Sequence, residues 1–395
     1  MTKRIGILTV GGDAPGQNIC LKSLVYSSME RAYDVIGIRK GWEGLINYNP
    51  DDPDTHSLNT MPLTKVRVRD IDRMPGSFLH SSRIEPDKMP DDPTNHIKRA
   101  IAKLGLDALV VLGDHAGLCY AAHLAQAGAP VIGIPKTVHN NIPGSDYALG
   151  FSTALGRGVR LINEIRAMAG SREEIAVIEI LGHTTGLTTM LISFLAGADH
   201  TLVPEVPFDP EKLARLLMND KQNNPANYAM LVMSEAASID PENISKYLPE
   251  LSRLANSRAV AEAVQKSGEG LTTDLLLFEI AQELGSRASG SGAVVTEMLE
   301  NITRQRMLFQ PLSYLLRTGE PDGQDLLGAM NFSTLAIQLI ADGKIGRLTA
   351  YRQRENYLEI PLDVVLGEPT NVRVSDFYDA ENYAVKPGIF WAARV

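Results

Sequence analysis

The sequence has few cysteines and no excess of positive charge, and both shortages narrow the class of protein. Cys20 and Cys119 are the only cysteines among 395 residues. Each lies in an apolar-patterned segment, and no Cys and His cluster has zinc-ligand spacing. Two isolated thiols favour a reducing compartment over a disulfide framework. The net charge is −9 and the basic stretch Lys65–Arg73 is short, so we expect no nucleic-acid partner. Any phosphate that the protein binds should then be held in a local pocket.

Long hydrophobic runs are also missing. No apolar stretch reaches the roughly 18 residues that a membrane-spanning helix needs, and the chain enters a strand pattern at Arg4–Val10 with no cationic leader before it. We therefore expect a cytoplasmic protein with no membrane partner.

The length and composition are those of a globular protein with more than one core. A chain of 395 residues exceeds what one hydrophobic core ordinarily supports. Hydrophobic residues make up 44% and charged residues 22%, which is ordinary for a folded soluble protein. Two domains are the expectation.

Short apolar runs alternate with helical patterns, which predicts an α/β fold built on parallel sheets with right-handed crossovers. The polar, proline-bearing segment Asn47–Pro62 is predicted to be a surface excursion, and the Gly/Ser-rich segment Gly285–Gly292 a linker. The expected strands are Ile5–Val10, Val35–Ile38, Ala108–Leu112, Pro130–Ile134, Ile175–Ile180, Leu202–Val203 and Tyr228–Met233. The main expected helices are residues 18–31, His96–Leu104, Thr153–Met168, Glu262–Leu284, Ala293–Ile302 and Asp325–Ile340.

Two loops that follow apolar strands carry the strongest signals for ligand binding. Gly11–Asn18 is a glycine loop that opens a helix, so its free N–H groups and the helix dipole favour an anion. It is not the Gly-x-Gly-x-x-Gly dinucleotide pattern, and a tight turn without a ligand is the alternative. Pro135–Ala154 follows the strand ending at Ile134 and contains an ammonium group, an imidazole, amides and a carboxylate. Loops at the carboxyl ends of parallel strands bind ligands, and this content suits an anionic ligand that bears hydroxyl groups.

Three charged side chains elsewhere fit the same kind of ligand. Asp114 leaves a buried strand into a small-residue turn, a common position for a magnesium ligand. Arg83 and Arg317 follow apolar or small-residue segments and have the guanidinium geometry that clamps phosphate. A surface ion pair is the plainer alternative for Arg83.

Taken in order, these loops resemble the phosphofructokinase family from residue 5 to about residue 345. The segments that carry the resemblance are Gly11–Asn18, Gly41–Gly44, Gly76–Arg83, Gly113–Asp114, Pro135–Ala154, Ser234–Glu235 and Tyr314–Gly319. Lys136 next to Pro135 is similar to the pyrophosphate-using branch, in which a lysine neutralises the inorganic donor.

The resemblance implies two Rossmann-like, doubly wound α/β domains and a homodimer or homotetramer. It places residues 1–150 and about 290–330 in a donor-binding domain, residues 151–289 and about 331–350 in a sugar-phosphate-binding domain, and residues 351–395 in a C-terminal extension. The implied activity is a magnesium-dependent transfer of phosphate from pyrophosphate or ATP to fructose 6-phosphate or a related sugar phosphate, as in glycolysis and carbohydrate metabolism.

The resemblance also assigns roles to individual residues. The implied donor-phosphate ligands are Gly11, Gly12, Arg83, His115 and Lys136, and the implied magnesium ligand is Asp114. The implied sugar-phosphate ligands are Asn140, Leu181, Gly182, His183, Glu235, Tyr314 and Arg317. The implied catalytic residues are Lys136, Thr137 and His139.

The sequence departs from the family pattern where catalysis is expected. The family's Thr-x-Asp-Asn-Asp stands here as Thr137–Asn141, with His139 and Asn141 in place of both aspartates. The family's Met-Gly-Arg turn is Leu181–His183. His115 replaces the Gly of ATP users or the Asp of pyrophosphate users.

Two interpretations of these departures remain open. In the first, His139 replaces aspartate as general base, since an imidazole with a pKa near about 6.5 is adequate, and the enzyme has altered specificity. In the second, catalysis is impaired and the chain is a sugar-phosphate-binding regulatory or partner subunit, because losing a catalytic base costs about 10²–10⁴-fold. A nicotinamide-dependent enzyme is a third class, and the sequence lacks its glycine spacing and following acidic residue.

Overall fold

The structure is a computed structural model, and it describes residues 3–82, 84–182, 185–238, 241–249 and 291–387. The chain divides into two compact units. Residues 1–154 and 317–370 form the first unit, and residues 155–316 and 371–395 form the second. The expected helix Glu262–Leu284 and most of the expected linker Gly285–Gly292 lie outside the described residues.

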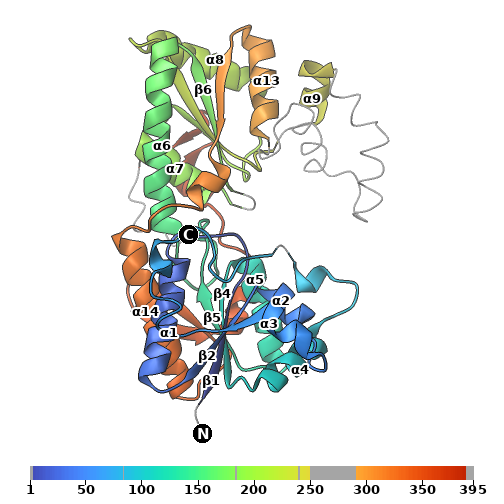
Figure 1. The fold of residues 1–395 in the computed structure, drawn as a ribbon. Helices are drawn as coiled ribbons and strands as arrows, with labels where there is room; N and C mark the ends of the chain where they lie inside the picture. The colour runs from blue at the N-terminus through green and yellow to red at the C-terminus, as the bar shows by residue number, and fades with distance from the viewer. Residues whose placement is uncertain (1–2, 83, 183–184, 239–240, 250–290, 388–395) are drawn as a thin grey trace. The chain divides into compact units, whose positions relative to one another are not determined.

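This division differs from the expected one in the last third of the chain. Residues 290–316 belong to the second unit, and residues 331–350, expected in the sugar-binding domain, belong to the first. The reason is packing. Helix α14 (Gly323–Ala341) lies against α1 (Gln17–Glu30) (Figure 1), and strand β10 (Arg347–Arg352) pairs with β5 (Val131–Pro135).

The first unit is organised around a sheet with strand order β11-β10-β5-β4-β1-β2-β3. The pairs from β10 to β2 are parallel, and the outer strands β11 and β3 pair antiparallel. The strands not yet given are β1 (Arg4–Thr9), β2 (Asp34–Ile38), β3 (Thr60–Pro62), β4 (Ala108–Gly113) and β11 (Asn356–Pro361).

Helices cover both faces of this sheet. Along β4, Val110 packs in one hydrophobic cluster with residues of α1 and α14, and Val111 packs in another with residues of α5 (His115–Gln126). A strand buried on both faces is the mark of a parallel, doubly wound sheet, so the predicted α/β class is confirmed. The remaining described helices here are α2 (Trp42–Asn47), α3 (His56–Asn59) and α4 (Thr94–Leu104), with the 3-10 turns η1 (Pro53–Thr55), η2 (Ile71–Arg73), η3 (Pro86–Lys88) and η5 (Leu362–Leu366).

The interpretation of Asn47–Pro62 as a surface excursion without elements was wrong. The segment contains α3 and strand β3, whose residues Thr60–Pro62 pair antiparallel with β2. A proline is tolerated in β3 because the strand lies at the sheet edge.

The second unit has a parallel sheet with strand order β7-β8-β6-β9. Its strands are β6 (Ile175–Ile180), β7 (His200–Leu202), β8 (Ala229–Ser234) and β9 (Met307–Pro311). Its helices are most of α6 (Phe151–Arg172), with α7 (Leu187–Ala196), α8 (Pro210–Asn223), α9 (Pro241–Tyr247) and α13 (Gly292–Thr303). The described part of this unit also contains a 3-10 turn η4 (Ser313–Leu316), helix α15 (Val374–Phe377) and a hairpin of β12 (Tyr378–Asp379) and β13 (Ala384–Val385). In the described part of the chain, no helix combines the length and apolar character needed to cross a membrane.

Candidate active site

The predicted loops of the first unit gather at the carboxyl ends of adjacent parallel strands. Thr9 of β1 pairs with Leu112 of β4, and Gly113 pairs with Pro135 of β5. The sheet register therefore places the glycine loop, Asp114 and Lys136 at one edge, as expected for an α/β binding site.

Gly11 and Asp114 approach so closely that only glycine fits. Gly11 has a φ of +74°, and a Cβ on it would stand 2.0 Å from Oδ2 of Asp114. Asp114 caps α5 by accepting a hydrogen bond at Oδ1 from the Gly117 N–H over 3.1 Å. The glycine thus leaves room for a carboxylate directly beside the loop backbone.

Lys136 is a buried cation. Its side chain is 1% exposed, and Nζ donates to the Gly12 carbonyl over 2.6 Å. Burial lowers the pKa of the ammonium group to about 8, although Asp114 and Asp13 oppose this shift. A nearby guanidinium, that of Arg317, lowers the pKa further.

Arg317 lies against the glycine loop, Gly11–Asn18, and against the loop Pro135–Ala154, which carries the predicted catalytic residues and is called the catalytic loop below. Its Nη1 would be 2.4 Å from a Cβ on Gly12 and donates to the Asp13 carbonyl over 3.4 Å. Its Nη2 lies 3.2 Å from Nε2 of His139. Because a guanidinium can only donate, Nε2 of His139 carries the lone pair in this contact. The resemblance implied a sugar-phosphate role for Arg317, and the structure brings it to residues expected to handle the donor.

Hydrogen bonds within the catalytic loop stabilise its conformation. The Thr137 hydroxyl accepts from the His139 N–H over 3.1 Å. The Asn140 amide donates to the Asp146 carbonyl over 3.0 Å and accepts from the Ala148 N–H over 2.8 Å, with Asn140 itself at a φ of +51°. The Asn140 side chain, implied as a sugar ligand, thus closes the loop on itself.

His115 contacts the C-terminal segment of the first unit. Its Nε2 lies 3.1 Å from the Gly367 carbonyl oxygen. Cys119, one turn later, donates from Sγ to the Val365 carbonyl over 3.2 Å, and burial raises the pKa of its thiol to about 11. The Thr370 N–H in turn donates to the Asn141 carbonyl over 3.2 Å. The segment from Val365 to Thr370 therefore reaches from α5 to the catalytic loop.

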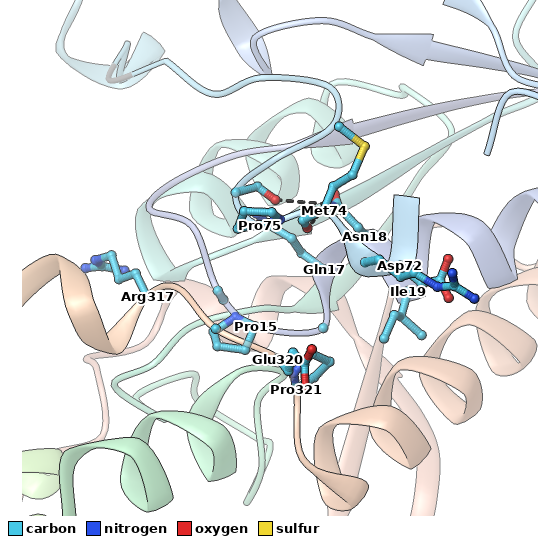
Figure 2. A pocket seen from close by; sticks show the side chains of 15 residues that line it. Pro15, Gln17, Asn18, Ile19, Asp72, Met74, Pro75, Arg317, Glu320 and Pro321 are labelled. Atoms are coloured by element: carbon cyan, nitrogen blue, oxygen red, sulfur yellow. Dashed lines mark hydrogen bonds between the residues drawn. The ribbon is translucent and has the colours of Figure 1, made fainter. Parts of the chain in front are cut away.

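The first unit also contains a pocket beside the predicted anion loop. It has a volume of about 210 Å³ and lies beside the start of α1, with Arg317 on its wall (Figure 2). Asn18 fixes one wall by donating to the Met74 carbonyl over 2.9 Å. The lining residues are Ala14–Ile19, Asp72–Gly76, Arg317 and Gly319–Pro321.

The second unit brings together the other implied sugar-phosphate residues. Ile180 of β6 pairs with Ser234 of β8, so Leu181 and Glu235 leave adjacent strands at the same edge. The Gly182 N–H donates to Oε1 of Glu235 over 3.4 Å.

The chain after β9, which also pairs with β6, carries Tyr314 in η4, where the residue is 55% exposed. Leu181, Gly182, Glu235 and Tyr314 therefore share one sheet edge in this unit. Arg83 and His183 lie outside the described residues.

The metal assignment depends on Asp114. Among the described residues, no three His, Cys, Asp or Glu side chains are grouped so that they could hold a metal ion by themselves. Magnesium commonly takes only one or two carboxylates, with waters and substrate phosphates as its other ligands.

Comparison with known proteins identifies the family to which the sequence belongs. The sequence model of the family described as Phosphofructokinase matches residues 4–340. An ATP-dependent 6-phosphofructokinase of Chloroflexus aurantiacus is 30% identical over 378 residues, 94% of this chain and 93% of that protein. A pyrophosphate–fructose 6-phosphate 1-phosphotransferase of Dictyoglomus thermophilum is 30% identical over 379 residues, 95% of this chain and 97% of that protein.

A solved structure agrees with the fold. That of a pyrophosphate-dependent phosphofructokinase from Nitrosospira multiformis has a TM-score of 0.73 at 13% identity, covering 97% of this chain and 89% of that one. At this identity the likeness concerns the fold alone. The family match and the two relatives carry the assignment further: the chain belongs to the phosphofructokinase family and is a phosphotransferase with an alcohol acceptor.

Proposed function

We propose that the protein transfers a phosphoryl group from pyrophosphate to a hydroxyl of fructose 6-phosphate or a related sugar phosphate. The observation that carries the donor assignment is the ammonium group of Lys136, 1% exposed and 2.6 Å from the Gly12 carbonyl oxygen. A compact buried cation suits a small, densely charged inorganic donor. The relative from Dictyoglomus thermophilum is named for this reaction, and that from Chloroflexus aurantiacus for ATP, which is the alternative donor.

Donor binding would use the loop backbone and two cations. N–H groups of Gly11 and Gly12 would contact phosphate oxygens, and Lys136 and Arg317 would neutralise their charge. His115, whose ring contacts the Gly367 carbonyl, and Arg83 would border the donor.

Asp114 fits the magnesium role. Its carboxylate supplies the hard oxygen ligands that magnesium prefers, and the absence of a Cβ on Gly11, which would stand 2.0 Å from Oδ2, lets this carboxylate lie directly beside the glycine loop that would bind the donor phosphates. Magnesium, when bound, would neutralise charge on the donor phosphates.

His139 would act as the general base. Its Nε2 faces the Arg317 guanidinium at 3.2 Å as an acceptor, so the neutral imidazole has a lone pair available. Arg317 would leave this contact for a phosphate group, and Nε2 would then take the proton of the sugar hydroxyl. The Thr137 hydroxyl holds the loop backbone at His139.

Acceptor binding would use the second unit. Glu235 would accept from sugar hydroxyls, while Gly182, Leu181, Tyr314 and His183 would contact the rest of the sugar phosphate. Asn140, closed on its own loop, would contribute backbone rather than side-chain contacts. Membership of the family also supports a cytoplasmic location and a homodimer or homotetramer. Light scattering would measure the oligomeric state.

Phosphorus NMR of the purified protein with magnesium tests this proposal. Pyrophosphate or ATP is offered with a panel of sugar phosphates, and the expected result is faster phosphorylation of a sugar phosphate with pyrophosphate. Equal or better turnover with ATP would overturn the donor assignment. Sugar-phosphate binding without turnover for any pair would favour the regulatory or partner subunit, which the replacement of both catalytic-loop aspartates by His139 and Asn141 makes the second candidate.

A further inference from the structure

Asp325 is a buried carboxylate that none of the roles above uses. It lies in the first turn of α14 and its side chain is 0% exposed. An anion buried so completely must be stabilised by partners that are themselves fixed. The question is which parts of the chain supply them.

The groups that donate hydrogen bonds to the Asp325 carboxylate belong to the end of the catalytic loop and the start of α6. Oδ1 accepts from the Tyr147 hydroxyl and, over 2.6 Å, from the Gly150 N–H. Oδ2 accepts from the N–H and the hydroxyl of Thr153 over 2.9 and 2.5 Å. Burial raises the pKa of Asp325, and these hydrogen bonds to the charged form oppose the shift.

The end of the catalytic loop is joined by backbone hydrogen bonds to its beginning, which carries Lys136. The Thr137 N–H donates to the Leu149 carbonyl over 3.0 Å, and the Leu149 N–H donates to the Pro135 carbonyl over 3.0 Å. Asp325 holds Gly150, the next residue. A shift at Gly150 would therefore be transmitted to Lys136 and to the loop that presents His139.

The other side of Asp325 is connected to Arg317. The segment from Arg317 leads straight into α14, whose N-cap Asp322 accepts from the Asp325 N–H over 2.9 Å. The Asp322 N–H donates to the Thr153 hydroxyl over 2.9 Å, so one hydroxyl links both segments. At the start of α1, a Cβ on Gly16 would stand 3.6 Å from the Asp325 Cβ and 3.0 Å from Leu149.

We propose that Asp325 is a positioning residue, which fixes the loop of His139 and the segment of Arg317 relative to one another so that their side chains meet. The kinetic consequence rests on the proposed function, whereas the geometric one does not. Misplacement of reacting groups by about 1 Å costs on the order of 100-fold in rate, so we expect Asp325→Asn to lower kcat/KM by about 10- to 100-fold. The asparagine side chain has the same size as the aspartate. Its NH2 group, however, replaces one acceptor oxygen by a donor, which would face the donor groups that now bind Asp325.

Nitrogen NMR of histidine-labelled protein is the test that does not need turnover. In the wild-type protein the His139 Nε2 resonance is expected at the position of a nitrogen that accepts a hydrogen bond, and the His139→Gln spectrum assigns it. Asp325→Asn is expected to move this resonance. Asp342→Asn, at the exposed end of the same helix where Gln338 donates to Oδ1 over 2.8 Å, is the matched control and should not move it.

Thr153 variants keep the test decisive if Asp325→Asn does not fold. Thr153→Val removes the shared hydroxyl and should move the resonance and lower kcat/KM, while Thr153→Ser should restore both. An unmoved His139 resonance in folded Asp325→Asn or Thr153→Val, with only a lower Tm, would overturn the positioning role. If the variants move the His139 resonance but the wild-type protein has no turnover, the result would instead count against the proposed function alone.

Discussion

The guanidinium of Arg317 donates from Nη2 to Nε2 of His139 over 3.2 Å, although the two residues are 178 positions apart in the sequence. The contact orients the imidazole and defines which nitrogen holds the lone pair. Protonation of Nε2 would put two donors face to face. The proposed base and the proposed phosphate-binding cation are therefore linked by a direct contact.

The first prediction concerns this linkage. His139→Ala should lower kcat by about 10²–10⁴-fold, the usual loss of a general base, and Arg317→Gln should also lower activity. Because the side chains touch, the double variant should lose less than the two single losses combined, by about 0.5–3 kcal/mol of coupling. Steady-state kinetics of the four proteins measures the coupling, and strictly additive losses would contradict it.

The second prediction concerns proton uptake by Lys136. Burial lowers its pKa from 10.5 to about 8, so the side chain is charged at pH 7 and largely neutral at pH 9. An anionic donor favours the ammonium form. Pyrophosphate binding at pH 9 should therefore take up about one proton, and almost none at pH 7. Calorimetry in buffers with different ionisation enthalpies measures this uptake, and Lys136→Met should abolish it.

The same pKa has a consequence for stability. Between pH 8 and 10.5 the unfolded chain binds the Lys136 proton and the folded chain does not, so this residue makes the free energy of unfolding rise with pH in that range. Denaturant titrations at several pH values measure the free energy of unfolding. Between pH 8 and 10.5 this free energy should rise less with pH, or fall more steeply, in Lys136→Met than in the wild type. If the two proteins show the same dependence on pH, the pKa of Lys136 is not lowered.

The third prediction concerns Gly12. A Cβ there would be 2.4 Å from Nη1 and 2.7 Å from Cζ of Arg317, and the guanidinium, as the end of a flexible side chain, can move away. Gly12→Ala should therefore change the free energy of unfolding by less than about 1 kcal/mol and still lower kcat/KM by roughly 10-fold or more. Gly156→Ala, where a Cβ would meet nothing within 4 Å, is the control. Equal activity of the two variants would argue against a role for Arg317 at this position.

The fourth prediction concerns His115. Its contact with the Gly367 carbonyl oxygen at 3.1 Å is worth about 0.5–1.5 kcal/mol. His115→Ala should lower the free energy of unfolding by that amount and increase amide hydrogen exchange at residues 367–370. His96→Ala removes a similar imidazole contact, to the Tyr48 carbonyl oxygen at 2.9 Å, and should leave exchange in the C-terminal segment unchanged.

The fifth prediction concerns Glu235, which accepts from the Gly182 N–H over 3.4 Å. A sugar phosphate at 100 times its Kd should stabilise the protein by about 2.7 kcal/mol, which a thermal scan records as a rise in Tm. Glu235→Gln should reduce this rise, and Glu164→Gln on α6 should not. No rise for the wild type at millimolar ligand would count against the acceptor site.

Much of the fold and part of the site could be predicted from the sequence. Buried parallel strands are continuous apolar runs, so Ala108–Leu112 and Ile175–Ile180 were predicted within one residue of the observed strands. Once these strands are aligned in parallel, the residues after them must share an edge. This rule brings Gly11, Asp114 and Lys136 together without knowledge of any side-chain contact.

The contacts that distinguish this chain could not be predicted in the same way. His115 and Gly367 are 252 positions apart, and Gly150 and Asp325 are 175 apart. No local pattern records such pairs, because they depend on how α14 and the C-terminal segment pack. The lowered pKa of Lys136 likewise follows from burial, which the residue type alone would argue against.

The division of the chain has a genetic consequence. The polypeptide passes from one unit to the other after residues 154, 316 and 370, so neither unit is encoded by an uninterrupted stretch of the gene. A premature stop before codon 370 would remove β12 and β13 from the second unit, and one before codon 316 would also remove α14, β10 and β11 from the first. The two units therefore cannot be exchanged between homologues by a single recombination event. A chimera that replaces one unit needs a breakpoint at each of the three positions where the chain passes between the units.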